Sequence, residues 1–343
     1  MGKPQGTTCA RRHAPRETAW ATGRLAGALL PVLILTVAIP IGADEPEGPE
    51  QAVIAPLASQ ALTLDAAVAG NRIVAVGERG HILVSRDGGT SWEQVPVPTR
   101  STLTGVCFAD ADHGWAVGHD SVILRTTDGG ASWERVHWAP EDEAPFFDVW
   151  FADAQHGVAV GAYGSYATTS DGGETWAFEE IDPDGWHLHR MIESPGGRLF
   201  IAGEAGMVYR SDDNGSSWQA LPSPYEGSFF GVLGLEDDVV LLFGLRGHLF
   251  RSEDAGESWT AIETGTLAML TDAVQLEDGT LVICGLRGVL LASEDGGRTF
   301  ERRQSGSRLG FAAILEVSPD RVLLVGEQGV KTVEVDDLSI VTD

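Results

Sequence analysis

The feature that most constrains this chain is a short motif that returns six times at nearly equal intervals. Each copy, called a box below, reads Ser/Thr-x-Asp-x-Gly-x-Ser/Thr-Trp/Phe, and the first spans Ser85–Trp92. The box aspartates are separated by 41, 43, 42, 41 and 41 residues. They are Asp87, Asp128, Asp171, Asp213, Asp254 and Asp295, and the tryptophans that end the first five boxes are Trp92, Trp133, Trp176, Trp218 and Trp259. Such regularity indicates a repeat architecture.

A second motif precedes each box by about eight residues. It consists of an apolar residue, Gly, two variable residues and usually a second Gly, as in Val76–Gly80. A seventh copy, Val325–Gly329, has no box after it. The chain therefore contains seven repeats, of which the last is truncated.

Turn signals divide each repeat into short strands. In the second repeat we predict strands over residues 102–109, 115–117, 122–126 and 133–138, because apolar alternation there is interrupted by Gly and Asp. Four strands in about 42 residues match one blade of a β-propeller. We predict an all-β fold, a seven-bladed β-propeller of four-stranded blades over residues 61–336, with a tail at 337–343. The 43 glycines suit the many tight turns of such a fold.

The last blade poses a closure problem, because the seventh repeat is too short for a fourth strand. Residues 51–59 lie before the first repeat and have no partner of their own. We expect residues 44–60 to form a linker and a ring-closing strand that pairs with the last blade. Such closure would remove the exposed edges of an open array.

The N-terminus has the pattern of an export signal. Four arginines precede an uncharged apolar run at residues 25–41, which ends in small residues and then Asp44. We predict a signal peptide over residues 1–43, cleaved after Ala43. The alternative is an uncleaved membrane anchor at residues 25–41, which is at the short limit for a bilayer span.

Charge and motif content exclude several functions. With 23 Lys+Arg against 50 Asp+Glu the formal net charge is −27, which argues against binding nucleic acid through phosphate neutralisation. Nine histidines are scattered, without H-E-x-x-H or C-x-x-C spacing, so we expect no metal and no cofactor. We interpret the box aspartates as structural turn residues. A blade width between them is too large for sharing a calcium ion at about 2.3–2.6 Å.

The boxes identify a resemblance. Their pattern is the Asp box of BNR repeats, found in sialidases, other glycosidases and sorting receptors. Together with the preceding Gly-x-x-Gly turn it resembles more closely the photosystem II stability and assembly factor family, over about residues 51–336. The resemblance implies an exported seven-bladed propeller in the thylakoid lumen or bacterial periplasm that binds a membrane-protein client. That client would be a photosystem II subunit, or another envelope protein such as a transporter in an organism that does not photosynthesise.

Arginines recur at one position of the Gly-x-x-Gly turns. Two residues after the first Gly stand Arg79, Asp120, Tyr163, Ala205, Arg246, Arg287 and Gln328. In a closed ring repeats five, six, seven and one are neighbours, so the three arginines share one arc. The connections between blades lie on the same face and bring Arg100, Arg308, Trp186, His187 and Tyr225 near it. Because arginine and aromatic residues anchor interfaces, we predict that this face binds the partner. The alternative is a set of solvated turns.

Two further hypotheses concern the axis and catalysis. One aligned position of the innermost strands carries Gly105, Asp148, Arg190, Gly231 and Asp272, which we expect to line the central channel. The alternative function is a sialidase-like glycoside hydrolase or a carbohydrate-binding propeller. A sialidase needs a tyrosine beside a carboxylate, and none of the four tyrosines stands beside an evident Glu and arginine set. We therefore favour a monomeric, non-catalytic scaffold.

Overall fold

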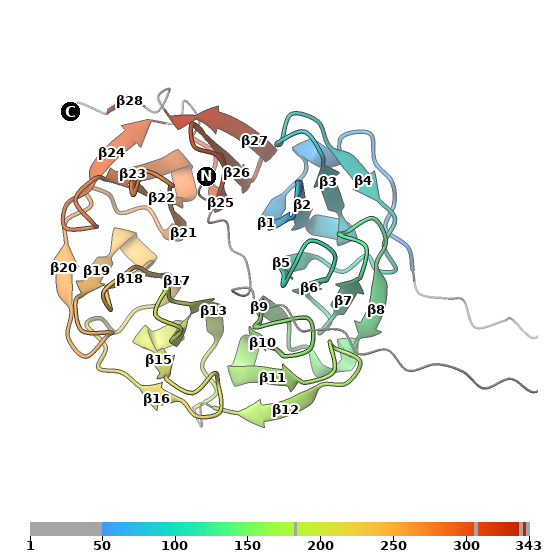
Figure 1. Ribbon diagram of the computed structural model, residues 1–343, viewed down its shortest axis with the longest axis horizontal. Helices are drawn as coiled ribbons and strands as arrows, with labels where there is room; N and C mark the ends of the chain where they lie inside the picture. The colour runs from blue at the N-terminus through green and yellow to red at the C-terminus, as the bar shows by residue number, and fades with distance from the viewer. Residues whose placement is uncertain (1–49, 182–183, 305–307, 336–338, 341–343) are drawn as a thin grey trace, which may run out of the picture.

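Seven antiparallel sheets surround a central axis and form a closed ring (Figure 1). The computed structural model describes residues 50–181, 184–304, 308–335 and 339–340. The predicted all-β, seven-bladed propeller is confirmed. In the second blade each strand end lies within one residue of its predicted position.

Each blade runs outward from the axis in chain order. Blades 1 and 2 are β1 (Thr63–Ala69), β2 (Arg72–Gly77), β3 (Ile82–Ser85), β4 (Glu93–Val95), and β5 (Leu103–Phe108), β6 (Gly114–Gly118), β7 (Ile123–Thr126), β8 (Glu134–His137). Blades 3 and 4 are β9 (Phe146–Phe151), β10 (Gly157–Gly161), β11 (Ser165–Thr169), β12 (Ala177–Glu180), and β13 (Leu188–Glu193), β14 (Leu199–Gly203), β15 (Val208–Ser211), β16 (Gln219–Ala220).

The remaining three blades are less uniform. Blade 5 is β17 (Phe229–Gly234), β18 (Val240–Gly244), β19 (Leu249–Ser252) and β20 (Thr260–Ile262). Blade 6 is β21 (Leu270–Gln275), β22 (Leu281–Gly285), β23 (Val289–Ser293) and β24 (Glu301–Gln304), with β28 (Ser339–Ile340) added at its outer edge. Blade 7 has three strands, β25 (Phe311–Ser318), β26 (Arg321–Gly326) and β27 (Gly329–Glu334).

The first glycine of each Gly-x-x-Gly turn is required by a close backbone approach. A Cβ on Gly77 would collide with the carbonyl oxygen of Leu62, and the other six equivalent glycines face the corresponding carbonyl in their own blades. The next residue donates its N–H to that carbonyl, as Glu78 does to Leu62 at 3.0 Å. The contact coincides with a bulge near the start of each innermost strand. The repeated glycine therefore fixes how the turn folds against the inner strand.

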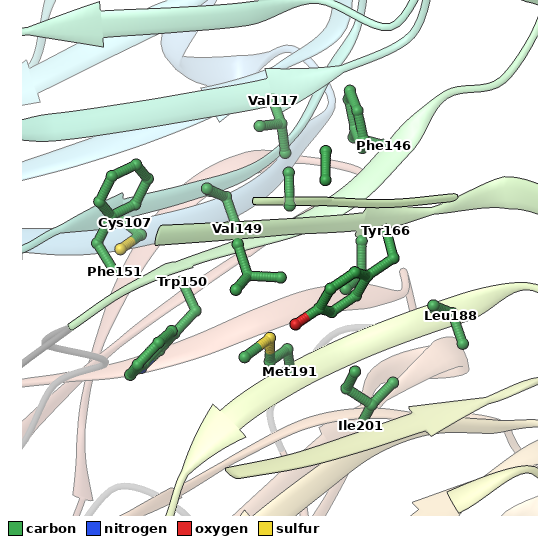
Figure 2. Packing of buried hydrophobic residues seen from close by; sticks show 14 of the residues in the cluster. Cys107, Val117, Phe146, Val149, Trp150, Phe151, Tyr166, Leu188, Met191 and Ile201 are labelled. Atoms are coloured by element: carbon green, nitrogen blue, oxygen red, sulfur yellow. The ribbon is translucent and has the colours of Figure 1, made fainter. Parts of the chain in front are cut away.

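The hydrophobic core lies between blades. One cluster joins blades 2, 3 and 4, where Trp115 stacks on Phe151 with ring centroids 3.4 Å apart and Tyr166 receives the indole N–H of Trp218 at 3.0 Å. Figure 2 shows part of this cluster, with Phe151 and Tyr166 among the labelled residues. Each box aromatic residue packs toward the preceding blade, as Trp133 does against blade 1. The boxes thus place one large apolar side chain in each of six interfaces.

Hydrogen bonds within the box explain its conformation. In the first box, Asp87 Oδ1 accepts the N–H of Ser91 at 2.8 Å, and Asp87 Oδ2 accepts the Ser91 hydroxyl at 2.6 Å. The Ser85 hydroxyl donates to Asp87 and accepts the N–H of Gly89. The bonds from Ser91 hold the pKa of Asp87 down at about 2. The other five boxes repeat this pattern at Asp128, Asp171, Asp213, Asp254 and Asp295.

The ring closes differently from the expectation. Residues 51–59 form no strand and do not pair with β27; they end in a short 3-10 turn at Ala58–Gln60. Their backbone bonds instead to blade 1, from Ala52 N–H to the carbonyl of Val97 and from Ala55 N–H to Gln94. Blades 7 and 1 meet through side chains, and Ala58 is buried in that interface. The predicted ring-closing strand is therefore wrong, because packing between the faces of β1, β25 and β26 already closes the ring.

The predicted signal peptide or anchor and most of the predicted tail lie outside the described residues. Within the described part of the chain, no helix is long and apolar enough to cross a membrane.

Candidate partner-binding face

The Gly-x-x-Gly turns hold side chains in a backbone conformation that normally favours glycine. Arg79, Arg246 and Arg287 have φ of 56°, 58° and 61°, and Tyr163 has φ of 55°. Asp120 and Ala205 occupy the same position with φ of 59° and 52°. A non-glycine residue in this left-handed region costs about 1–2 kcal/mol. Three of the seven turns carry arginine in this conformation, and the others with positive φ carry Asp, Tyr or Ala.

The connections between blades lie against these turns. A Cβ on Gly80 would collide with the carbonyl of Thr99, next to Arg100, and one on Gly206 would collide with the carbonyl of Tyr225. The backbone N–H of Tyr163 donates to His187 Nδ1 at 2.9 Å, beside Trp186. Turns and connections therefore share one face of the ring, which we call the turn face.

Four arginines on the turn face have free guanidinium groups. Arg79, Arg246, Arg287 and Arg308 are exposed, and among the described residues none of their side chains makes an ion pair. Arg100 differs, because its Nε donates to the carbonyl of Gln51 at 3.0 Å and its guanidinium lies 3.6 Å from Glu50. Arg100 therefore helps to hold the segment that precedes blade 1.

Arginines elsewhere are mostly paired. Arg86 lies 2.8 Å from Glu93, Arg125 lies 2.6 Å from Glu134, and Arg210 lies 3.0 Å from Glu257. In a chain with a net charge of −27, pairing is the expected fate of an arginine. The free cations of the turn face are thus a local exception.

Exposed apolar side chains lie among these arginines, and sequence reasoning did not select them. Leu245 and Leu286 directly precede Arg246 and Arg287, and each is more than a third exposed. Leu267 and Leu309 are 82% and 38% exposed in the following connections. The repeated Leu-Arg-Gly sequence at residues 245–247 and 286–288 was the available signal. The face over blades 5 to 7 is therefore both cationic and apolar.

Aromatic and histidine side chains gather over blades 3 to 5. His189 stacks on Phe230 with ring centroids 4.6 Å apart, and its Nδ1 donates to the carbonyl of Phe229 at 2.8 Å. Burial lowers the pKa of His189. Tyr163 packs edge-on against His187, and Tyr163 is 67% exposed. The turn face over blades 3 and 4, which carries none of the four free arginines, thus offers rings for contact.

At the axis the structure brings together three of the predicted channel residues and adds a fourth. The guanidinium of Arg190 lies 3.4 Å from Asp272, 3.6 Å from Asp148 and 3.8 Å from Asp65. Sequence reasoning missed Asp65, which occupies the same bulged position in blade 1. We call these four residues the axis cluster. Gly105 and Gly231 hold the equivalent positions in blades 2 and 5.

Burial dominates the electrostatics of the axis cluster. The four side chains are between 5% and 15% exposed. Burial raises the pKa of Asp65 to about 7, and it also raises the pKa values of Asp148 and Asp272 although Arg190 opposes the effect. Burial works against the charge of Arg190, but the three carboxylates together raise its pKa above the ordinary value.

Tyr166 and the potential metal ligands bear on the alternative, catalytic function. Tyr166 is buried between blades, and burial raises its pKa to about 12, which is opposite to the requirement of a nucleophilic tyrosine. Across the ranges that the structure describes, no group of three or more His, Cys, Asp or Glu is arranged to hold a metal ion.

Solved structures with this fold include two of YCF48. One, described as "YCF48 bound to D1 peptide", is 21% identical with a TM-score of 0.68, covering 89% of this chain and 100% of that chain. YCF48 from Cyanidioschyzon merolae is 19% identical with a TM-score of 0.67, covering 83% of this chain and 98% of that one. The WD40 propeller of Doa1, at 10% identity and a TM-score of 0.66, has the same fold over 85% of this chain and 98% of that one.

A family model matches this chain, although no individual curated protein does. No curated protein matches the chain. The family model described as "Photosynthesis system II assembly factor YCF48" matches residues 89–146 and 138–288, which is more than half of the 343 residues. The chain therefore belongs to the family of the photosystem II assembly factor YCF48.

Proposed function

We propose that this protein is a non-catalytic, exported assembly factor that binds an extended segment of a membrane-protein client on its turn face. The observation that carries the proposal is the set of free arginines, Arg79, Arg246, Arg287 and Arg308, on a molecule whose other arginines are mostly paired. By family membership the client is a photosystem II subunit or another envelope protein. The signal at residues 1–43 would deliver the chain, as a monomer, to the lumen or periplasm.

Charge complementarity indicates what the client segment carries. A guanidinium binds a carboxylate through two parallel hydrogen bonds, and arginine also stacks on aromatic rings. The net charge of −27 repels an acidic segment from most of the surface and favours its approach to the free arginines. We therefore expect an extended segment with carboxylates, whose apolar side chains contact Leu245, Leu286 and Trp186.

Two matched double variants test this proposal. Arg246→Glu with Arg287→Glu and Arg86→Glu with Arg298→Glu both change the net charge from −27 to −31, since each reversal subtracts two. Arg86 and Arg298 belong to the box turns, where they pair with Glu93 and Glu253. Binding is measured by fluorescence anisotropy with a labelled D1 peptide and by capture from detergent-solubilised membranes, and melting curves control for folding.

The turn-face variant should bind the peptide at least about tenfold more weakly, a change of about 1.4 kcal/mol, with an unchanged melting temperature. The box variant should bind nearly as well as the natural chain. An equal loss of peptide affinity in both variants would show that overall charge, and not the turn face, causes the effect. Unchanged affinity in the turn-face variant would show that the client binds elsewhere on the protein. If the natural chain captures a different membrane protein and does not bind the D1 peptide, the client is that protein. Loss of this capture in the turn-face variant would still assign binding to the turn face.

A further inference from the structure

The axis cluster contains more negative than positive charge in a nearly closed site. Three carboxylates, from blades 1, 3 and 6, surround one guanidinium from blade 4 at 3.4–3.8 Å. If all four groups are ionised, the site holds two uncompensated negative charges at 5–15% exposure. Burying an unpaired charge costs several kcal/mol, so such a group usually takes up a proton or a counter-ion.

The aspartates are fixed in place and cannot turn toward solvent without breaking bonds between blades. Asp65 Oδ2 accepts the N–H of Val106 at 2.9 Å, which joins blade 1 to blade 2. Asp148 Oδ2 accepts the N–H of Met191 at 2.8 Å, joining blades 3 and 4. Asp272 Oδ2 accepts the N–H of Ile314 at 3.0 Å, joining blades 6 and 7. The carboxylates are therefore part of the connections between blades.

The elements around the cluster supply no second cation among the described residues. The equivalent positions in blades 2, 5 and 7 are Gly105, Gly231 and Ala313.

Other titratable groups on the strands around the cluster include Cys284, His189 and Glu316. The buried thiol of Cys284 on β22 adds no positive charge. His189 on β13 is turned to the carbonyl of Phe229, and burial lowers its pKa. Glu316 on β25 is bonded to the N–H of Glu277, and Glu277 and Asp278 add negative charge there. None of these groups compensates the two excess negative charges of the axis cluster.

We propose that the axis cluster is a proton-binding site, in which the three carboxylates keep at least one proton at neutral pH and release it in mildly basic solution. The lifted pKa of Asp65, about 7, agrees with this charge count. A carboxyl whose pKa is raised on folding stabilises the fold fully below its unfolded value, and this stabilisation is lost as pH rises through the folded value. The axis cluster therefore stabilises the ring more in a mildly acidic compartment than in a basic one.

Asp65→Asn is the first test, because asparagine resembles the protonated acid and its Oδ1 can still accept the N–H of Val106. Because the unfolded carboxyl already ionises near pH 4, the variant should melt above the natural chain at pH 6. Linkage to a pKa near 7 should widen this difference by about 3 °C at pH 9. The exposed turn variant Asp237→Asn is the matched control and should show no such pH-dependent difference. An Asp65→Asn difference that is equal at pH 6 and pH 9 would overturn the proposal.

Two further measurements keep the proposal testable if Asp65→Asn folds poorly. Carbon-13 NMR of the natural chain should show an aspartate carboxyl that titrates near pH 7, and titration of every aspartate below pH 5 would overturn the proposal. Adding 5 mM CaCl2 or 200 mM KCl, against choline chloride at equal ionic strength, should leave the melting temperature at pH 8 unchanged. A cation-specific rise together with a flat pH profile would instead assign the site to a metal ion and refute proton binding.

Discussion

Arginine has opposite environments at the axis and on the turn face. Arg190 has a side chain only 15% exposed and lies within 3.8 Å of three carboxylates from three other blades. Arg246 and Arg287 are exposed, and no side chain in the described part of the molecule pairs with either. The same residue type is thus held by carboxylates in one region and remains exposed and unpaired in the other.

The difference shows how a strongly acidic chain can keep cations free. With 50 acidic residues against 23 basic ones, most arginines find a carboxylate on a neighbouring strand or box. The Gly-x-x-Gly turns place arginine at the end of a blade, where Arg246 and Arg287 are each flanked by Leu and Gly. Charge separation in this molecule therefore depends on where the arginines lie in the blade, and less on how many there are.

The largest expected effect comes from removing the buried arginine. Arg190→Met leaves three carboxylates without a counter-charge and should lower the free energy of unfolding by about 3–5 kcal/mol, as for other broken buried ion pairs. Arg287→Met should change it by no more than about 0.5 kcal/mol. Urea unfolding at pH 7 measures both. Similar changes in the free energy of unfolding for the two variants would show that the axis arginine and the turn-face arginine do not differ in their contribution to stability.

Salt should have a smaller effect, which also differs between the turn face and the axis cluster. Exposed charges are screened with a Debye length of about 10 Å at 0.1 M and about 3 Å at 1 M ionic strength. Raising NaCl from 50 to 500 mM should weaken peptide binding on the turn face severalfold, in an anisotropy titration. Because the axis cluster is largely buried, the loss of stability caused by Arg190→Met should hardly change. Salt-independent binding would argue that the apolar residues dominate the face.

The smallest effect concerns the backbone at the arginine turns. Arg246→Gly removes a side chain from a residue with φ of 58°, so the melting temperature should stay the same or rise by a few degrees. Peptide binding should weaken in the same variant. Ala205→Gly, at φ of 52° in blade 4, is the control that relieves the same strain without removing a charge. A lower melting temperature in Arg246→Gly alone would show that the arginine stabilises the fold.

Much of the fold could be predicted because the signals are local. A box closes through hydrogen bonds between residues two to four apart, such as Ser85, Asp87 and Ser91, so its sequence is sufficient to indicate the turn. The ring-closing strand failed for a different reason. Residues 51–59 are apolar enough for a strand, but Pro56 lacks an N–H and the segment bonds to Gln94 and Val97 of blade 1. The choice of neighbour depended on packing that no local pattern records.

The candidate sites divide in the same way. The recurrence of Arg79, Arg246 and Arg287 at one turn position was visible in the sequence, whereas their lack of ion-pair partners was not. Asp148, Arg190 and Asp272 were aligned as channel residues, but Asp65 was overlooked and the contacts among them could not be foreseen.

A few adjacent residues are enough to specify each blade, the turn that carries each arginine and the box that places an aromatic residue between sheets, so these features could be read from the sequence. The closure of the ring, the free state of some arginines and the contact of Arg190 with Asp65, 125 residues away, became evident in the folded chain alone. Those outcomes depend on the curvature of the ring, which the packing of all seven interfaces sets together.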